Sequence, residues 1–390
     1  MNGFSCAKVV LVEKTIASED RRFMKLRDRI SWLMGTLQRH LFPRLEECCE
    51  RPLTDKEQQL VSILELLQIE KFVGPPTPKR CGRKLSERRA VARAFVGKAV
   101  YNHPTTRATR EALRNSSVFR RICGFVTAGD IPSEATFSRA FAEFAKQGLG
   151  DRVHEALVES CVKTQLVGHI SRDATAIKGR EKPVAKPPVD KPEPRKKGRP
   201  RRGEVREPKA PTRLERQCHQ SAAEALAELP VHCDVGTKRN SQGYKESWRG
   251  YKLHADVNDC CLPISVELTA ASLHDSQVAI PLMKITSERV TYLYDLMDAA
   301  YDAKPIYEVS RTLGHVPIID KNSRGKDVIP MAPHEALRYR ERSVAERFNS
   351  RLKEEFGARN VMVRGVKKVR LHLMFGVIAL FADQVLKLIG

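Results

Sequence analysis

From residue 166 onward, five segments with the pattern of β-strands recur in an order that few folds accommodate. They are rich in β-branched and aromatic residues and end in turn-forming residues. No long helical pattern separates the second from the third, whereas residues at helical spacing follow the third, fourth and fifth. The segments lie at 166–177, 250–258, 263–271, 290–298 and 315–320. This order predicts an antiparallel meander continued as a parallel sheet, which is a mixed α/β sheet.

A long insert at about 179–232 interrupts this pattern between the first and second predicted strands. Its first part, 179–213, contains eight of the 22 prolines and a large excess of Lys and Arg. Such a composition cannot bury enough apolar surface to fold, so we expect a basic, largely disordered insert. Within it, "KKGRPRR" resembles an AT-hook, which lies along an A·T minor groove. The DNA-contacting residues would then be Lys197, Arg199 and Arg201; a basic linker with general phosphate affinity is the alternative.

The chain before the predicted sheet is helical. Residues 1–80 have apolar residues at spacings of three and four, and Thr54 with Glu57 forms a capping box. Residues 81–160 contain short Arg-rich helical segments joined by tight turns, which suits a DNA-binding domain of the helix-turn-helix type. A small helical bundle with a basic surface explains the same pattern. We therefore expect a helical DNA-binding region followed by the sheet domain at 161–390.

The charge of the chain indicates its class of partner. Lys and Arg number 69 against 47 Asp and Glu, which gives a formal net charge of +22. Such a balance favours a polyanionic partner, most commonly nucleic acid. A membrane surface is the alternative, but the N-terminus lacks a signal-peptide pattern and the apolar run at 373–382 is ten residues long, which suits a buried helix. We expect a cytoplasmic, nucleoid-associated protein that binds DNA and no membrane.

The cysteines indicate neither a disulfide framework nor a standard zinc site. Ten are scattered along the chain without a CxxC pair, as in proteins that keep reduced thiols. Four residues have side chains of the zinc-binding types, namely Cys218, His219, His232 and Cys233. Adjacent ligands fit a tetrahedral site poorly, and the segment between the two pairs has the pattern of a short helix. We therefore expect no zinc here.

Three acidic residues are candidates for one site. Asp173 lies in the first predicted strand, Asp298 ends the fourth, and Glu346 lies in the helix after the fifth. Asp is common at strand ends and turns for structural reasons alone. In this sheet order, however, the first and fourth strands are expected to be central neighbours. Three converging carboxylates repel one another unless divalent cations bridge them, and such cations activate water for phosphodiester cleavage. Mg²⁺ is the expected ion, with Mn²⁺ as a substitute.

The helix that carries Glu346 has two stripes. Tyr339, Arg342, Glu346 and Lys353 are three, four and seven residues apart, so on an α-helix they project in nearly one direction. A separate apolar stripe consists of Val344, Phe348, Leu352 and Phe356. One face therefore packs on a core, and the other presents a carboxylate between two cations. The alternative is a solvated face with an Arg342–Glu346 pair that contributes only a few tenths of a kcal/mol.

These features together resemble the DDE transposases of bacterial insertion sequences. The resemblance is carried by "DATAI", "MDAAYD" and "YRERSVAERFNSRLK", the last of which matches the Tyr-x2-Arg-x3-Glu-x6-Lys signature of one group at every spacing. It implies an RNase H-like catalytic domain in which Asp173, Asp298 and Glu346 are the catalytic metal ligands. Arg342 and Lys353 would face the DNA phosphates, and Tyr339 would support the same face.

The activity implied by this resemblance is DNA transposition. Such an enzyme binds the terminal inverted repeats of its element, cleaves a strand and joins the end to target DNA, as a homo-oligomer assembled on double-stranded DNA. Two alternatives remain: a metal-dependent nuclease of the same fold, and a non-catalytic DNA-binding protein derived from a transposase. Several relatives form DNA hairpins with a Trp in an insertion between the second Asp and the Glu. Here 47 residues separate them without a Trp, so we expect no such step.

Three other acids compete for the site. Asp295 should point away from Asp298, because side chains alternate along a strand, and Asp302 lies beyond the strand. The family pattern of Asp, two residues and Tyr-Asp also selects Asp298. Asp320 is a rival to Glu346, but it lacks the neighbouring Arg and Lys.

Overall fold

The computed structural model describes residues 51–74, 87–184, 210–239, 242–323, 327 and 330–389. The candidate AT-hook residues Lys197, Arg199 and Arg201 lie outside these ranges, as do residues 1–50 of the predicted helical region.

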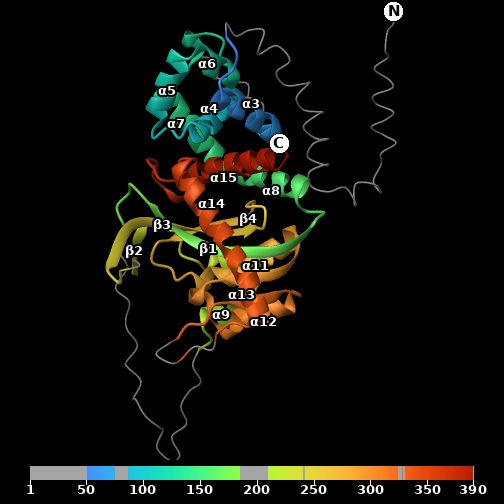
Figure 1. The fold of residues 1–390 in the computed structure, drawn as a ribbon. Coiled ribbons are helices and arrows are strands. Elements are labelled where there is room, and N and C mark those ends of the chain that lie inside the picture. The colour runs from blue at the N-terminus through green and yellow to red at the C-terminus, as the bar shows by residue number, and fades with distance from the viewer. Residues whose placement is uncertain are drawn as a thin grey trace, which may run out of the picture.

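A mixed sheet of six strands forms the centre of the described chain (Figure 1). Its middle strand is β1 (Leu166–Lys178). On one edge β1 pairs antiparallel with β3 (Lys245–Asn258), which pairs antiparallel with β4 (Pro263–Ala270). On the other edge β1 pairs parallel with β5 (Thr291–Met297), which pairs parallel with β6 (Val316–Ile319). The five predicted strands and their mixed order are therefore confirmed.

The sixth strand, β2 (Asp234–Arg239), was not predicted. It pairs antiparallel with the first half of β3, from Lys245 to Gly250. Four of its six residues are exposed, and its sequence is DVGTKR, so it lacks the apolar alternation that marks a half-buried strand. Its place in the sheet depends on pairing with β3.

The predicted insert is folded in its second part. Residues 210–232 contain α9 (Arg213–His219) and α10 (Ala222–Ala227), each started by a capping box. Both pack on α11 (Ser276–Arg289). The short helix expected between Cys218 and Cys233 is thus present as α10, whereas the expected disorder does not extend through residues 210–232. The Pro-rich stretch 185–209 lies outside the described residues.

Helices cover both faces of the sheet. α11 and α12 (Lys304–Thr312) lie on one face, where α11 contacts β3, β4 and β5. On the other face, α13 (Pro333–Tyr339) leads through one 3₁₀ turn, η5 (Arg340–Arg342), into α14 (Ser343–Glu354), which packs on β1 and β3. The predicted apolar stripe of α14 is confirmed, because Val344, Phe348 and Leu352 are all buried.

A helical region precedes the sheet, as predicted. The Thr54–Glu57 capping box starts its first described helix. Ser116 ends the third and caps the fourth, which makes the turn between them very tight. The helices are α3 (Asp55–Leu67), α4 (Arg88–Val100), α5 (Thr106–Asn115), α6 (Ser117–Cys123), α7 (Glu134–Lys146) and α8 (Leu149–Cys161). Short 3₁₀ turns follow α3 and α6 at η2 (Ile69–Lys71) and η3 (Ala128–Asp130).

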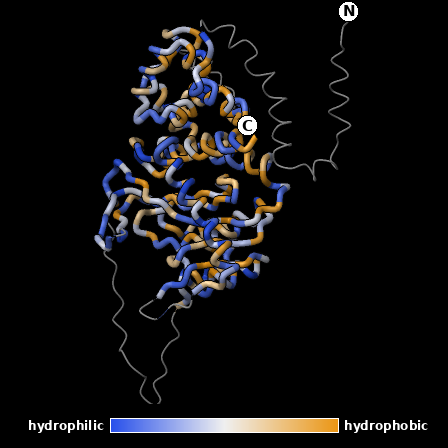
Figure 2. Tube along the Cα trace, in the orientation of Figure 1, coloured by the Kyte–Doolittle hydropathy of each residue, from blue (hydrophilic) through white to orange (hydrophobic). Residues whose placement is uncertain are grey.

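The C-terminal helix α15 (Val366–Ile389) joins the two parts of the molecule. It packs on α3, α4, α7 and α8 of the helical region and also on β4 and α14 (Figure 1). Phe375 of α15 stacks on Phe95 of α4 with ring centroids 5.6 Å apart. Figure 2 shows hydrophobic segments in both parts and in the layer between them, and one hydrophobic cluster spans both. The last predicted domain, 161–390, therefore shares its core with the helices before it.

α15 is the one described helix that is long and apolar enough to cross a membrane. Its most apolar window is 72% buried inside the protein, however. The apolar run at 373–382 thus belongs to a buried helix, as expected.

Candidate active site

The sheet brings Asp173 and Asp298 to adjacent positions. Ser171 of β1 is the parallel partner of Leu296 of β5, and the two aspartates each lie two residues further along. Because side chains two residues apart share a face, Asp173 lies on the face of Ser171, whose hydroxyl donates to the carbonyl of Glu341 in η5. The site therefore lies where β5 ends beside the middle of β1, under η5 and α14. The prediction that these strands are neighbours is confirmed.

Hydrogen bonds fix each carboxylate. Nδ2 of Asn349 in α14 donates to Oδ2 of Asp173 at 2.9 Å. Asp298 caps the 3₁₀ turn η4 (Ala299–Tyr301), where Oδ1 accepts from the N–H of Ala300 at 2.9 Å. Each aspartate has thus one oxygen committed to a hydrogen bond of the protein.

Burial makes both aspartates harder to ionise. It raises the pKa of Asp173 to about 6, and the charges of Asp298 and Asp275 add to this rise. The pKa of Asp298 is also raised, first by burial and then by Asp275. The guanidinium of Arg342 opposes the rise at both aspartates without cancelling it. The site therefore has too little positive charge for its carboxylates.

Glu346 lies in the first turn of α14, where Arg342 holds its carboxylate. Nη2 of Arg342 donates to Oε1 of Glu346 at 2.5 Å, and the Glu346 side chain is 58% exposed. Within the described ranges, no group of three or more His, Cys, Asp or Glu side chains is arranged to hold a metal ion. The structure therefore brings together the two aspartates, while Glu346 is paired with a cation.

The predicted helix 339–353 is not continuous. Tyr339 ends α13, Arg342 ends η5, and the α-helix begins at Ser343. Side chains three residues apart eclipse in a 3₁₀ turn, so Tyr339 and Arg342 still point the same way. The guanidinium carbon of Arg342 lies 5.8 Å from the centre of the Tyr339 ring. The shared direction of these residues survives the change of helix type.

Lys353 lies further along the same face of α14. Its Nζ donates to Oγ1 of Thr175, two residues after Asp173 on β1, at 2.5 Å. Burial lowers the pKa of Lys353, and the nearby Lys238 lowers it further. Lys178 and Arg359 line the same cavity as Lys353, which has a volume of about 400 Å³. A cluster of cations therefore continues from the aspartates along β1.

A profile of the family described as "Transposase DDE domain" matches residues 173–382, which is more than half of the chain. The chain belongs to this family. A second profile, "Transposase domain (DUF772)", matches residues 48–143 in the helical region. Comparisons with curated proteins and with solved structures found no match.

Membership of the transposase DDE family explains the architecture. The mixed sheet with helices on both faces is the RNase H-like arrangement expected for such a domain, and a helical region precedes it. The match begins at Asp173 and includes Asp298 and Glu346. Family membership implies an enzyme that cleaves DNA and transfers strands, and members generally use a divalent metal ion.

The chemistry of this transposase domain's aspartates fits such an ion. Asp173 and Asp298 supply the oxygen ligands that Mg²⁺ prefers, and their raised pKa values show a deficit of positive charge. Two uncharged groups close by also lack partners within the described chain: Oδ1 of Asn349 and the hydroxyl of Tyr301 are buried without a hydrogen bond. Of the three predicted ligands, the two aspartates fit an ion as they stand, and Glu346 fits once it leaves Arg342.

Sequence reasoning missed Asp275, Asn349 and the position of Tyr301. Asp275 precedes α11, and its carboxylate accepts from Nζ of Lys252 on β3 at 2.8 Å. It raises the pKa of both site aspartates, and it also acts on Tyr301, whose pKa burial raises well above its ordinary value. Asn349 could have been predicted from the sequence, because it lies three residues after Glu346 on the same helix face. Asp275 could not, since only the sheet brings it near.

The competing acids lie elsewhere, as predicted for Asp295. It is fully buried on the opposite face of the sheet, where the hydroxyl of Ser310 donates to it at 2.6 Å. Asp302 follows η4 and lies 3.7 Å from Nζ of Lys321. Asp320 follows β6, where its Oδ1 accepts from the N–H of Lys321.

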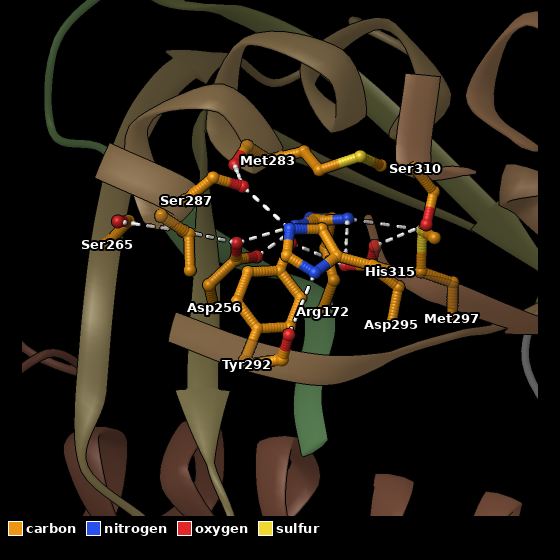
Figure 3. A network of polar contacts seen from close by, with 11 residues as sticks. Arg172, Asp256, Ser265, Met283, Ser287, Tyr292, Asp295, Met297, Ser310 and His315 are labelled. Carbon is orange, nitrogen blue, oxygen red and sulfur yellow. Dashed lines mark hydrogen bonds and ion pairs between the residues drawn. The ribbon is translucent and has the colours of Figure 1, made fainter. Parts of the chain in front are cut away.

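Arg172, the residue before Asp173, centres a polar network on that opposite face (Figure 3). It forms two hydrogen bonds with its cross-strand partner Asp256, at 2.7 and 2.6 Å, and one with Asp295 at 3.4 Å. Thr286 of α11 also donates to Asp256 at 2.6 Å. The network ties β1, β3 and β5 together directly beneath the site aspartates.

Proposed function

We propose that this protein is a DNA transposase of the group with the Tyr-x2-Arg-x3-Glu-x6-Lys signature. It binds the terminal inverted repeats of its insertion sequence and catalyses metal-dependent strand cleavage and strand transfer. The adjacent placement of Asp173 and Asp298 on the central strands supports this most directly, because it joins two carboxylates that the chain separates by 125 positions. The helical region at 81–160 contacts the repeats, and protomers assemble on DNA in the cytoplasm, at the nucleoid.

Each side chain of the site has a distinct role. Asp173 and Asp298 hold Mg²⁺, or Mn²⁺ in its place, and Glu346 joins them when DNA phosphates compete for Arg342. Bound Mg²⁺ supplies the activation of water and the stabilisation of the leaving oxygen in phosphodiester chemistry. Asn349 orients the carboxylate of Asp173 through its hydrogen bond. Arg342, with Tyr339 beside it, binds the phosphate next to the cleaved bond, and Lys353 binds the next phosphates along β1.

Arg342 is suited to this exchange of partners. Burial alone would lower its pKa, but the charges around it, Tyr339 first among them, raise the pKa above its ordinary value. It is therefore a permanent cation, 19% exposed, between the two aspartates and the more exposed Glu346. A guanidinium binds a phosphate through two parallel hydrogen bonds, which an ammonium cannot match.

Three single variants test the assignment on a labelled element end in Mg²⁺. Asp173→Asn, Asp298→Asn and Glu346→Gln should each abolish cleavage while leaving repeat binding largely intact, because each removes a ligand charge and keeps the basic surface. Cleavage products and electrophoretic mobility shifts would be measured on the same preparations.

Two results would change the proposal. Cleavage near the parental rate by one variant would remove that residue from the site. Cleavage by the parent protein without any joining to target DNA would make the protein a nuclease of the same fold.

A further inference from the structure

A second basic cavity lies between the helical region and the segment that leads into α15. It has a volume of about 390 Å³. Lys98 and Phe95 of α4 line it from one side, and Arg364 and Lys368 line it from the other. Arg180, which follows β1, lines it as well. The cavity thus lies where three separate parts of the chain meet.

Lys98 is buried in this cavity without a counter-ion. Its exposed fraction is 9%, and within the described chain its ammonium group has neither a hydrogen bond nor an ion pair. Burial lowers the pKa of Lys98 to about 8. The neighbouring His372 supplies no negative charge, and because burial lowers its pKa to about 3 it is neutral at physiological pH. An uncompensated buried ammonium is costly, so a ligand that supplies negative charge would be strongly favoured here.

The acids nearby are already engaged. Glu134 is the one acidic residue of the described cavity wall, and it lies 3.6 Å from Nε of Arg107. Glu181 lies close by, but its carboxylate accepts from the hydroxyl of Tyr251 and from the N–H of Gly365. Neither carboxylate neutralises the cavity's cations. The wall therefore carries a net positive charge.

We propose that this cavity binds a backbone phosphate of the DNA, with Lys98 as its innermost contact. The inference rests on the proposed function, since DNA is the ligand. Asp173 lies within β1 and Arg180 lies just after its end, and at the rise of a strand the chain between them spans roughly 20 Å. Lys178, Lys353 and Arg359 lie along that stretch, so cations mark a path from the active site to the cavity. A duplex that follows this path passes about six base pairs, at roughly 3.4 Å each.

Lys98→Met tests the site, because Met fills the space of the lysine stem and removes its charge. Without ligand, the variant should melt at a higher temperature than the parent, since an unpaired buried charge is gone. In duplex DNA titrations over a series of salt concentrations, its log–log slope should be smaller by about one. Inorganic phosphate should raise the melting temperature of the parent and not that of Lys98→Met.

Two further variants sharpen the result. Lys163→Met is the matched control, because Lys163 pairs with Glu159 beside Glu155 and Glu288 on an acidic surface, where DNA is not expected. It should keep the parental salt slope. Arg364→Gln removes an exposed cation from the cavity wall and should lower the slope as Lys98→Met does, without a change in folding.

The outcomes separate this site from the function on which it rests. DNA binding and cleavage by the parent test the transposase assignment, whereas the difference between Lys98→Met and Lys163→Met tests the cavity. Equal salt slopes for these two variants would overturn the inference, even if the parent cleaves DNA. Loss of the phosphate effect with an unchanged DNA slope would also overturn it, because the ligand would then be free phosphate.

Discussion

Arg172 and Asp173 are neighbours in the chain, yet they belong to opposite faces of the sheet and to opposite electrostatic regimes. On the Arg172 face, one buried guanidinium serves two buried carboxylates, and the hydroxyls of Ser310 and Tyr292 donate to Asp295 (Figure 3). The hydroxyl of Thr286 donates to Asp256. On the Asp173 face, Asp173, Asp298 and Glu346 share the guanidinium of Arg342. Burial is common to both faces, so burial alone does not identify a functional site. A functional site is instead marked by buried charges that lack partners of opposite charge.

The difference has a physical reading. Burial would lower the pKa of Arg172, but Asp256 and Asp295 raise it above its ordinary value. Burial raises the pKa of Asp256 as it does that of Asp173, yet Asp256 accepts hydrogen bonds from the guanidinium of Arg172 and from Thr286, so its partners lie within the protein. The pKa of Asp173 is raised to about 6 because its partners do not offset its burial. A closed network contributes to structural specificity, whereas an undercompensated one favours binding of a cation.

The largest expected effect on stability comes from opening the closed network. Arg172→Met leaves two buried carboxylates without their cation, which should cost about 3–5 kcal/mol of unfolding free energy. Chemical denaturation at neutral pH measures this. Adding Asp256→Asn to Arg172→Met should recover part of the loss, because one uncompensated charge is then removed. A double variant that is less stable than Arg172→Met would contradict the closed network.

Asp173→Asn should instead raise the free energy of unfolding of the metal-free protein. The folded pKa of Asp173, about 6, lies above its ordinary value of 3.8, so the folded state binds the proton more tightly than the unfolded state does. The stability from this proton is complete below pH 4 and is lost as the pH rises through 6. Without metal, the Asn variant should therefore be more stable than the parent above pH 6, by on the order of 2 kcal/mol.

Melting temperatures of the parent and of Asp173→Asn, measured from about pH 3.5 to about pH 7.5, would reveal this pH-dependent difference in stability. A constant difference across the range would show that Asp173 does not titrate as proposed. Mg²⁺ should raise the melting temperature of the parent at neutral pH and leave that of Asp173→Asn almost unchanged. An equal Mg²⁺ effect on both proteins would place the ion elsewhere.

The smallest effect on stability is expected for Arg342→Lys. The Arg342–Glu346 pair is an i,i+4 pair with one exposed partner, and such pairs contribute less than about 1 kcal/mol. Cleavage in single-turnover conditions should nevertheless be much slower, because lysine keeps the charge and loses the paired hydrogen bonds to phosphate. A variant that both melts and cleaves like the parent would make this pair an ordinary surface contact.

The sequence by itself determined the sheet, because strand-like segments, turns and helical spacing are local patterns that the five predicted strands follow. It also predicted that Asp173 and Asp298 lie on neighbouring strands, which the pairing of β1 with β5 confirms, whereas the role of these acids and of Glu346 stays a prediction. It missed β2, whose polar sequence DVGTKR forms a strand through its pairing with β3. It did not anticipate the 3₁₀ turn before Ser343 either, because such a turn keeps the spacing of Tyr339 and Arg342.

Only the tertiary structure decided which charges have partners. Lys98 resembles any other lysine of a basic helix in the sequence, and Asp275 resembles a residue of a turn. Burial and neighbours from distant segments make one of them an ammonium without a counter-ion and the other a carboxylate near the active site. Electrostatic interactions depend on distance and burial in space, which residue order does not encode locally. For that reason the sequence predicted which residue types carry the chemistry, and only the fold determined which of their charges lack partners.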